Sequence, residues 1–131
     1  MNNDRNSVLI HENQETVWNA ITNDEIISKW YAPGSKWNIP KLQFGEKAIF
    51  VLMPSAHNNL KENESIPMSF TIQEIIPYER FSYSSDTDKL VFTFEIFPES
   101  EGTRVSINMD GYELSLANLK ACLEGKELPY T

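Results

Sequence analysis

The chain has few of the residues that mark several common classes of protein. Cys122 is its one cysteine among 131 residues, which excludes an intramolecular disulfide and argues against a cysteine-based zinc site. The longest apolar run, at positions 48–53, is six residues, whereas a membrane-spanning helix needs about 20. The first 15 residues hold only a three-residue apolar run, too short for a secretory signal. We therefore expect no stable membrane insertion and a reducing, cytoplasmic setting.

Basic clusters and phosphate-binding motifs are also missing. Lys and Arg number 11 against 19 Asp and Glu, a formal net charge of -8, so no nucleic-acid partner is expected. The glycines at 34, 45, 102, 111 and 125 form no phosphate loop, nucleophile elbow or dinucleotide fingerprint, and we predict no cofactor. His11 and His57 have no second ligand at helical spacing, so we predict no metal site and place His57 in a solvated loop.

What remains is an ordinary globular composition, with 40% hydrophobic and 23% charged residues, and a length that suits one domain over residues 1–131. Residues 7–11 are predicted to form a first strand. Asn13 is expected to cap a short helix through Ala20. A capping box at residues 22–25, using the Thr22 hydroxyl and the Glu25 carboxylate, predicts a second helix that ends at residues 32–34.

From residue 35 to residue 109 the hydrophobic period changes from helical to two, which predicts an antiparallel meander. Leu90 and Met109 are included in its strands. Acidic residues in or beside these strands, Asp88, Glu95 and Asp110, alternate with the apolar set and are expected on a solvated outer face. The apolar face carries most of the large side chains: Phe50, Phe70, Phe81, Tyr83, Phe92 and Phe94.

The last predicted element is an amphipathic helix over residues 112–124. Its apolar stripe consists of Tyr112, Leu116, Leu119 and Leu123 and should dock on the apolar face of the sheet. Leu114, Ala117 and Ala121 lie on the far side of the helix. Three explanations for their position are open: chance, contact with the N-terminal helices, or the seam of a homodimer. The predicted class is α+β, with a sheet curled round one closing helix.

Three stretches of the chain carry a family resemblance: residues 15–22 (ETVWNAIT), residues 30–34 (WYAPG) and residues 111–125 (GYELSLANLKACLEG). They resemble the START-like superfamily, also called SRPBCC or Bet v 1-like, in its branch named after the activator of the heat-shock-protein-90 ATPase. The resemblance implies a helix-grip fold, in which a bent seven-stranded antiparallel sheet wraps round the C-terminal helix and two short helices follow the first strand. Members enclose an apolar pocket for lipids, polyketides or flavonoid-like aromatics; some are cyclases or hydrolases, and one eukaryotic group stimulates a chaperone ATPase.

The candidate site is the predicted cavity between sheet and closing helix. Its candidate lining residues share an apolar body and an expected inward position, although packing in a filled core is the alternative for each one. They are Trp30, Tyr31, Trp37, Phe50, Leu52, Met68, Phe70, Phe81, Tyr83, Phe92, Phe94, Tyr112, Leu116 and Leu119. Met53 is a further adaptable wall element, and residues 55–65 are either a mobile rim or an idle loop. Cys122 is expected to be a small hydrophobe rather than a nucleophile, and no catalytic residue is predicted.

Three functions follow from these predictions. The favoured one is a non-enzymatic binding protein for a small hydrophobic or aromatic ligand. The second is an enzyme of the cyclase or hydrolase kind, which requires a titratable group in the cavity. The third is an interaction module that acts on a chaperone ATPase; the sequence shows no charged or apolar patch that supports such a contact.

Overall fold

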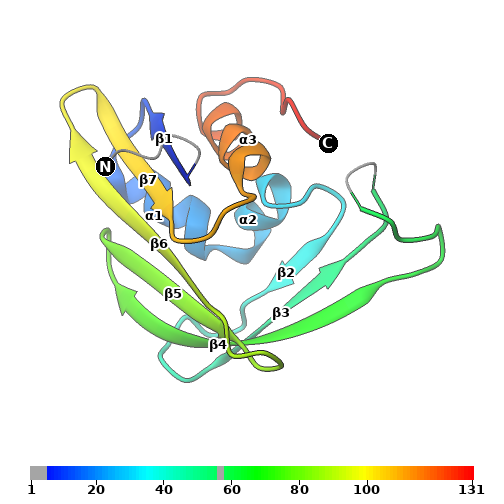
Figure 1. The fold of residues 1–131 in the computed structure, drawn as a ribbon. Helices are drawn as coiled ribbons and strands as arrows, with labels where there is room; N and C mark the ends of the chain where they lie inside the picture. Colours follow the sequence, from blue (N-terminus) through cyan, green and yellow to red (C-terminus); the bar gives the residue numbers. More distant parts are fainter. Residues whose placement is uncertain (1–5, 56–57) are drawn as a thin grey trace.

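The computed structural model describes residues 6–55 and 58–131 (Figure 1). His57, predicted in a solvated loop, therefore lies outside the described residues. The elements follow the predicted order, and in sequence they are β1 (Ser7–Ile10), α1 (Gln14–Thr22), α2 (Asp24–Trp30), β2 (Lys36–Asn38), β3 (Lys47–Leu52), β4 (Ile66–Ile76), β5 (Arg80–Ser85), β6 (Val91–Glu99), β7 (Gly102–Ile107) and α3 (Glu113–Leu123).

The strands form one seven-stranded sheet in the order β1-β7-β6-β5-β4-β3-β2, with every neighbouring pair antiparallel. Figure 1 shows the sheet curled, with the three helices on its concave side. A bulge in β4 shifts the register between Ile72 and Glu74, and such an extra residue bends a strand and increases its twist. The predicted α+β helix-grip architecture is confirmed.

The two short helices have asparagine caps. Asn13 Oδ1 accepts a hydrogen bond from Thr16 N at 2.8 Å, as predicted, although α1 continues to Thr22. The predicted capping box at Thr22 is wrong. Asn23 caps α2 by accepting from the amides of Glu25 and Ile26. Because α1 runs to Thr22, that residue is still helical, and its hydroxyl donates back to Trp18 O at 2.8 Å.

Helix α3 docks through the predicted stripe. Leu116 and Leu119 are buried, and Tyr112 and Leu123 are half-buried at its ends. Gly125, with φ +75°, ends the helix while Lys126 N donates to Ala121 O at 2.8 Å, the Schellman arrangement that left-handed glycine permits. Ala121 is buried in a helix that contacts α1 and α2, which supports the second alternative for that residue.

The meander differs from its prediction at the ends of two strands. Leu90 precedes β6 and is 49% exposed. It belongs to the hairpin connection that includes the turn at residues 86–89, in which Lys89 has φ +64°. Met109 lies beyond β7, which ends at Ile107. The inward face otherwise follows the predicted alternation, with Phe81 opposite Phe94 and Tyr83 opposite Phe92. Among the residues described, no helix is long and apolar enough to cross a membrane.

Candidate functional site

An aromatic cluster occupies the space between the concave face and α3. Trp37 lies opposite Phe50 in the β2–β3 pair, which places both rings on one face, and their centroids are 5.0 Å apart. Trp37 also contacts Phe70 and Tyr83, each at a centroid distance of 5.3 Å. Tyr31, which follows α2, contacts Trp37 and Phe50 at 5.3 Å. At these separations the rings pack against one another and fill much of the interior.

The structure brings all the candidate cavity residues into one apolar cluster. Those that are buried in it are Trp30, Trp37, Phe50, Phe70, Phe81, Tyr83, Phe94, Leu116 and Leu119. Those that pack against it and are half-buried are Tyr31, Leu52, Met68, Phe92 and Tyr112. Cys122 is likewise half-buried against the cluster. Met53, the other expected wall element, is 37% exposed.

A few polar atoms lie inside this apolar cluster. The hydroxyls of Tyr31 and Tyr112 share a hydrogen bond of 2.5 Å. The buried Tyr83 hydroxyl interacts with the Tyr31 hydroxyl. Trp37 Nε1 is buried and has no hydrogen-bond partner among the described residues, whereas Trp30 Nε1 donates to Ala20 O at 2.9 Å. Burial raises the pKa of Tyr31, Tyr83 and Tyr112 well above the ordinary value. The three phenols are therefore neutral at physiological pH.

A pocket of about 340 Å³ opens beside the cluster, between the end of β3 and the first turns of α3. Two of the candidate residues, Tyr31 and Leu52, line it. Ser55 and Asn58 from the predicted rim also contribute. The full lining is Tyr31, Ala32, Pro33, Ser35, Leu52, Ser55, Asn58, Gly111, Leu114, Ser115, Asn118, Tyr130 and Thr131. Apolar side chains, hydroxyls and amides thus surround the pocket.

Hydrogen bonds hold the walls of this pocket in place. Ser115 Oγ donates to Tyr31 O at 2.6 Å, which fixes α3 to the segment after α2. Ser35 Oγ accepts from Met53 N at 2.8 Å, which joins that segment to the end of β3. Asn118, which is 2% exposed, donates through Nδ2 to the carbonyl of Tyr130 at 2.6 Å. Sequence reasoning missed Ser115 and Asn118, because polar residues on an amphipathic helix normally face water.

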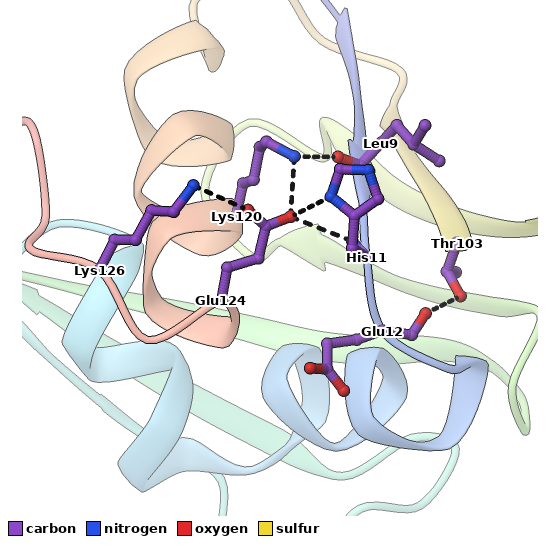
Figure 2. Close-up of polar contacts among 7 residues, drawn as sticks. All are labelled: Leu9, His11, Glu12, Thr103, Lys120, Glu124 and Lys126. Carbon is purple, nitrogen blue, oxygen red and sulfur yellow. Dashed lines mark hydrogen bonds and ion pairs between the residues drawn. The ribbon is translucent and has the colours of Figure 1, made fainter. Parts of the chain in front are cut away.

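A second cluster of polar side chains joins the end of β1 to the end of α3 (Figure 2). Glu124 Oε2 accepts a hydrogen bond from His11 N at 3.0 Å and lies 3.0 Å from His11 Nδ1. The same oxygen pairs with Lys120 Nζ at 2.8 Å. Lys120 also donates to Leu9 O at 2.8 Å. The hydrogen bond from Lys120, with those from His11, lowers the pKa of Glu124 to about 2.

This carboxylate is fully engaged in holding the two elements together. An open hollow of about 420 Å³ borders His11, but its other walls are Glu12, Asn13, Gln14, Pro98, Glu101, Gly102 and Thr103. Within residues 6–55 and 58–131, no group of three or more His, Cys, Asp or Glu side chains is placed to hold a metal ion. The Glu124 cluster is therefore an anchor of the fold, and the pocket beside the aromatic cluster is the better candidate site.

A curled antiparallel sheet that grips a C-terminal helix over an aromatic interior defines the START-like class of α+β proteins. The family described as Activator of Hsp90 ATPase homolog 1-like protein matches residues 12–128, and the chain belongs to it. The resemblance inferred from residues 15–34 and 111–125 is thereby confirmed. No curated protein sequence matches the chain significantly.

Solved structures show the same fold at low sequence identity. A protein from Nitrosomonas europaea superposes with a TM-score of 0.75 at 16% identity, over 91% of this chain and 92% of that chain. An AHSA1-like protein from Aeromonas hydrophila gives a TM-score of 0.69 at 18% identity, over 91% and 90%. A protein from Bordetella parapertussis gives 0.71 at 16% identity, over 94% and 75%. At such identities the likeness concerns the fold alone.

Proposed function

We propose that this protein binds a small hydrophobic or aromatic molecule, of the lipid, polyketide or flavonoid-like kind, between the sheet and the C-terminal helix. The observation that carries the proposal is the pocket of about 340 Å³ between β3 and α3, backed by the aromatic cluster. A concave, mainly apolar space with a few fixed polar groups is the usual form of a small-molecule site. Membership of a superfamily whose members commonly bind such ligands supports the same proposal.

Binding without turnover is favoured over the enzyme alternative by the chemistry of the lining. Among the described residues that line the pocket, the only side chains with titratable protons are the phenols of Tyr31 and Tyr130. Burial raises the pKa of Tyr31 well above its usual value, which makes it a poor acid or base near neutral pH. We place this binding in the cytoplasm, on the ground that the sequence has a single cysteine.

The proposal is tested by native mass spectrometry of freshly purified protein and by thermal shift with lipids, flavonoids and polyketide-like compounds. A ligand at 100 times its dissociation constant should stabilise the folded state by about 2.7 kcal/mol, which raises the melting temperature by several °C. Absence of both a co-purified molecule and any shift across the three compound classes would contradict the proposal.

A pair of matched variants locates the site. Leu114 lines the pocket and is 40% exposed, so Leu114→Trp should fill the pocket with little effect on folding. Leu90, which is 49% exposed at the hairpin before β6, gives the control Leu90→Trp. We expect the thermal shift to disappear in the first variant and to persist in the second. Equal shifts in both variants would place the ligand elsewhere.

A further inference from the structure

The segment that follows α3 closes one side of the pocket. Figure 1 shows residues 125–131 turning back alongside α3. Within this segment Leu128 is half-buried and the other residues are exposed. Tyr130 and Thr131 line the pocket. A segment that buries so little apolar surface opens at a lower free-energy cost than the packed strands and helices around it.

Asn118 holds this segment by its backbone. Its Nδ2 donates to Tyr130 O at 2.6 Å, and its Oδ1 accepts from Tyr130 N at 3.0 Å. Asn118 itself lines the pocket and is 2% exposed. Because Nδ2 carries two protons, it also donates to Trp30 O at 3.3 Å, at the end of the buried helix α2. That second bond keeps the amide in place when Tyr130 moves away.

Two other polar side chains of the pocket bind to the packed part of the fold. Ser115 Oγ donates to Tyr31 O, and Ser35 Oγ accepts from Met53 N. Tyr31 directly follows α2 and Met53 directly follows β3, whereas the partner of Asn118 lies in an exposed segment. A molecule that displaces this segment must replace its hydrogen bonds, because a buried amide that loses its partners is strongly disfavoured.

We infer that the molecule bound in this pocket displaces Tyr130 and takes its place on Asn118, through an N–H group and a carbonyl arranged as in one amino-acid residue. This inference rests on the proposed function and adds the chemical class of the ligand, an apolar and uncharged N-acyl amino acid derivative. The described residues that line the pocket have no charged side chain, and an ion buried among them without a counter-charge is disfavoured. Residues 125–131 are then a strap with which the ligand competes.

The experiment compares three neutral probes: N-acetylphenylalanine methyl ester, its analogue with an ester oxygen in place of the N–H, and biphenyl, which has neither polar group. Affinities come from titration into ¹⁵N-labelled protein. We expect the amide probe to bind about 2- to 10-fold more tightly than its ester analogue, the range for one hydrogen bond. It should also speed hydrogen exchange at Tyr130 N, which loses Asn118 Oδ1 as its acceptor. Exchange at Lys126 N, bonded to Ala121 O, should stay unchanged and serves as the internal reference.

Two variants at position 130 separate the backbone N–H from the side chain. Tyr130→Pro removes the N–H that donates to Asn118, whereas Tyr130→Ala loses the same ring and keeps the N–H. Tyr130 is 37% exposed, so both variants should fold. We expect the amide probe to bind about 2- to 10-fold more tightly to Tyr130→Pro than to Tyr130→Ala, because the strap competes less well without this bond. Asn118→Leu should abolish the preference for the amide probe over its ester analogue.

The outcomes distinguish this inference from the proposed function. Equal affinity for the amide probe and its ester analogue, with biphenyl bound, would overturn the inference and leave apolar binding standing. Unchanged or slower exchange at Tyr130 N in the bound protein would overturn it as well, because the strap then stays in place. Equal affinity of the two variants at position 130, or a preference that survives in Asn118→Leu, would have the same consequence.

Failure of the proposed function has a different signature. Binding of none of the three probes would overturn this inference. The absence of any thermal shift across lipids, flavonoids and polyketide-like compounds, with no co-purified molecule, would overturn the proposed function.

Discussion

The side-chain amide of Asn118 brackets the backbone of Tyr130. Nδ2 donates to Tyr130 O at 2.6 Å, and Oδ1 accepts from Tyr130 N at 3.0 Å. The same Nδ2 lies 3.3 Å from Trp30 O, so one residue of α3 connects the end of α2 with the last residues of the sequence. Tyr130 and Thr131 line the pocket, and Asn118 therefore fixes one of its walls.

Replacing Asn118 by leucine tests this bracket. Asn118→Leu keeps the size of the side chain but leaves the carbonyls of Trp30 and Tyr130 without their donor. We expect a loss of about 1 to 3 kcal/mol in the free energy of unfolding, the range for buried polar groups that lose a partner. Hydrogen exchange should show faster exchange at the amide of Tyr130. Unchanged stability and unchanged exchange would mean that the bracket does not hold the wall.

Docking of α3 is tested by truncating its most buried stripe residue. Leu119 is 0% exposed, so Leu119→Ala should lower the free energy of unfolding by about 2 to 5 kcal/mol through the void it leaves. Leu114→Ala, on the exposed side of the same helix, should change it by less than about 0.5 kcal/mol. Denaturant titration measures both, and similar losses in the two variants would show that α3 does not pack through this stripe.

The fold was predictable because its signals are local. Alternation at residues 68–73 and 91–96 and a helical stripe at Leu116 and Leu119 depend only on near neighbours, and the strands and helix lie there. The prediction failed where two local signals competed. Thr22 and Asn23 are both good caps, and the length of α1, which tertiary packing sets, decided between them.

The candidate site was predictable only as a face of the sheet. Alternation placed the aromatic residues inward, which the structure confirms for Phe50, Phe70 and Phe94. The alternation gave no signal for the pocket, because most residues that line the pocket belong to loops and to α3. Contacts such as that of Ser115 with Tyr31, 84 positions apart, bring these residues together. The roles of Asn118 and Glu124 were missed for the same reason, since Asn118 bonds to Trp30 O across 88 positions and Glu124 to His11 N across 113.

Gly102 faces the backbone of β1 so closely that a side chain does not fit. A Cβ atom at this position would lie 2.1 Å from the carbonyl oxygen of Ile10. Gly102→Ala should therefore displace β1 from β7, with a loss of about 1 to 3 kcal/mol in the free energy of unfolding. Gly111→Ala is the control, because its Cβ meets nothing within 4 Å although its φ is +90°. Only the first variant should speed hydrogen exchange at Val8 and Ile10, and equal exchange in both would exclude the clash.

Acid should weaken the anchor between β1 and α3. Hydrogen bonds from Lys120 and His11 lower the pKa of Glu124 to about 2 from an ordinary value of 4.5. As the pH falls, the unfolded chain binds this proton first, so the contribution of Glu124 is complete above about pH 4.5 and is lost as the pH falls towards 2. The free energy of unfolding should therefore decline between pH 4.5 and pH 2. Comparison with a variant that lacks this carboxylate separates the contribution of Glu124 from that of the other acidic groups.

The variant Glu124→Gln isolates the contribution of this group. At pH 7 it should lower the free energy of unfolding by about 1 to 2 kcal/mol, because a charge-assisted hydrogen bond becomes a neutral one. The difference between this variant and the unmodified protein should shrink from pH 4.5 towards pH 2, as measured by urea titration at each pH. Glu127→Gln removes the same charge from a nearby exposed position and should show no such trend. A difference that stays constant with pH would show that Glu124 contributes through packing rather than through its charge.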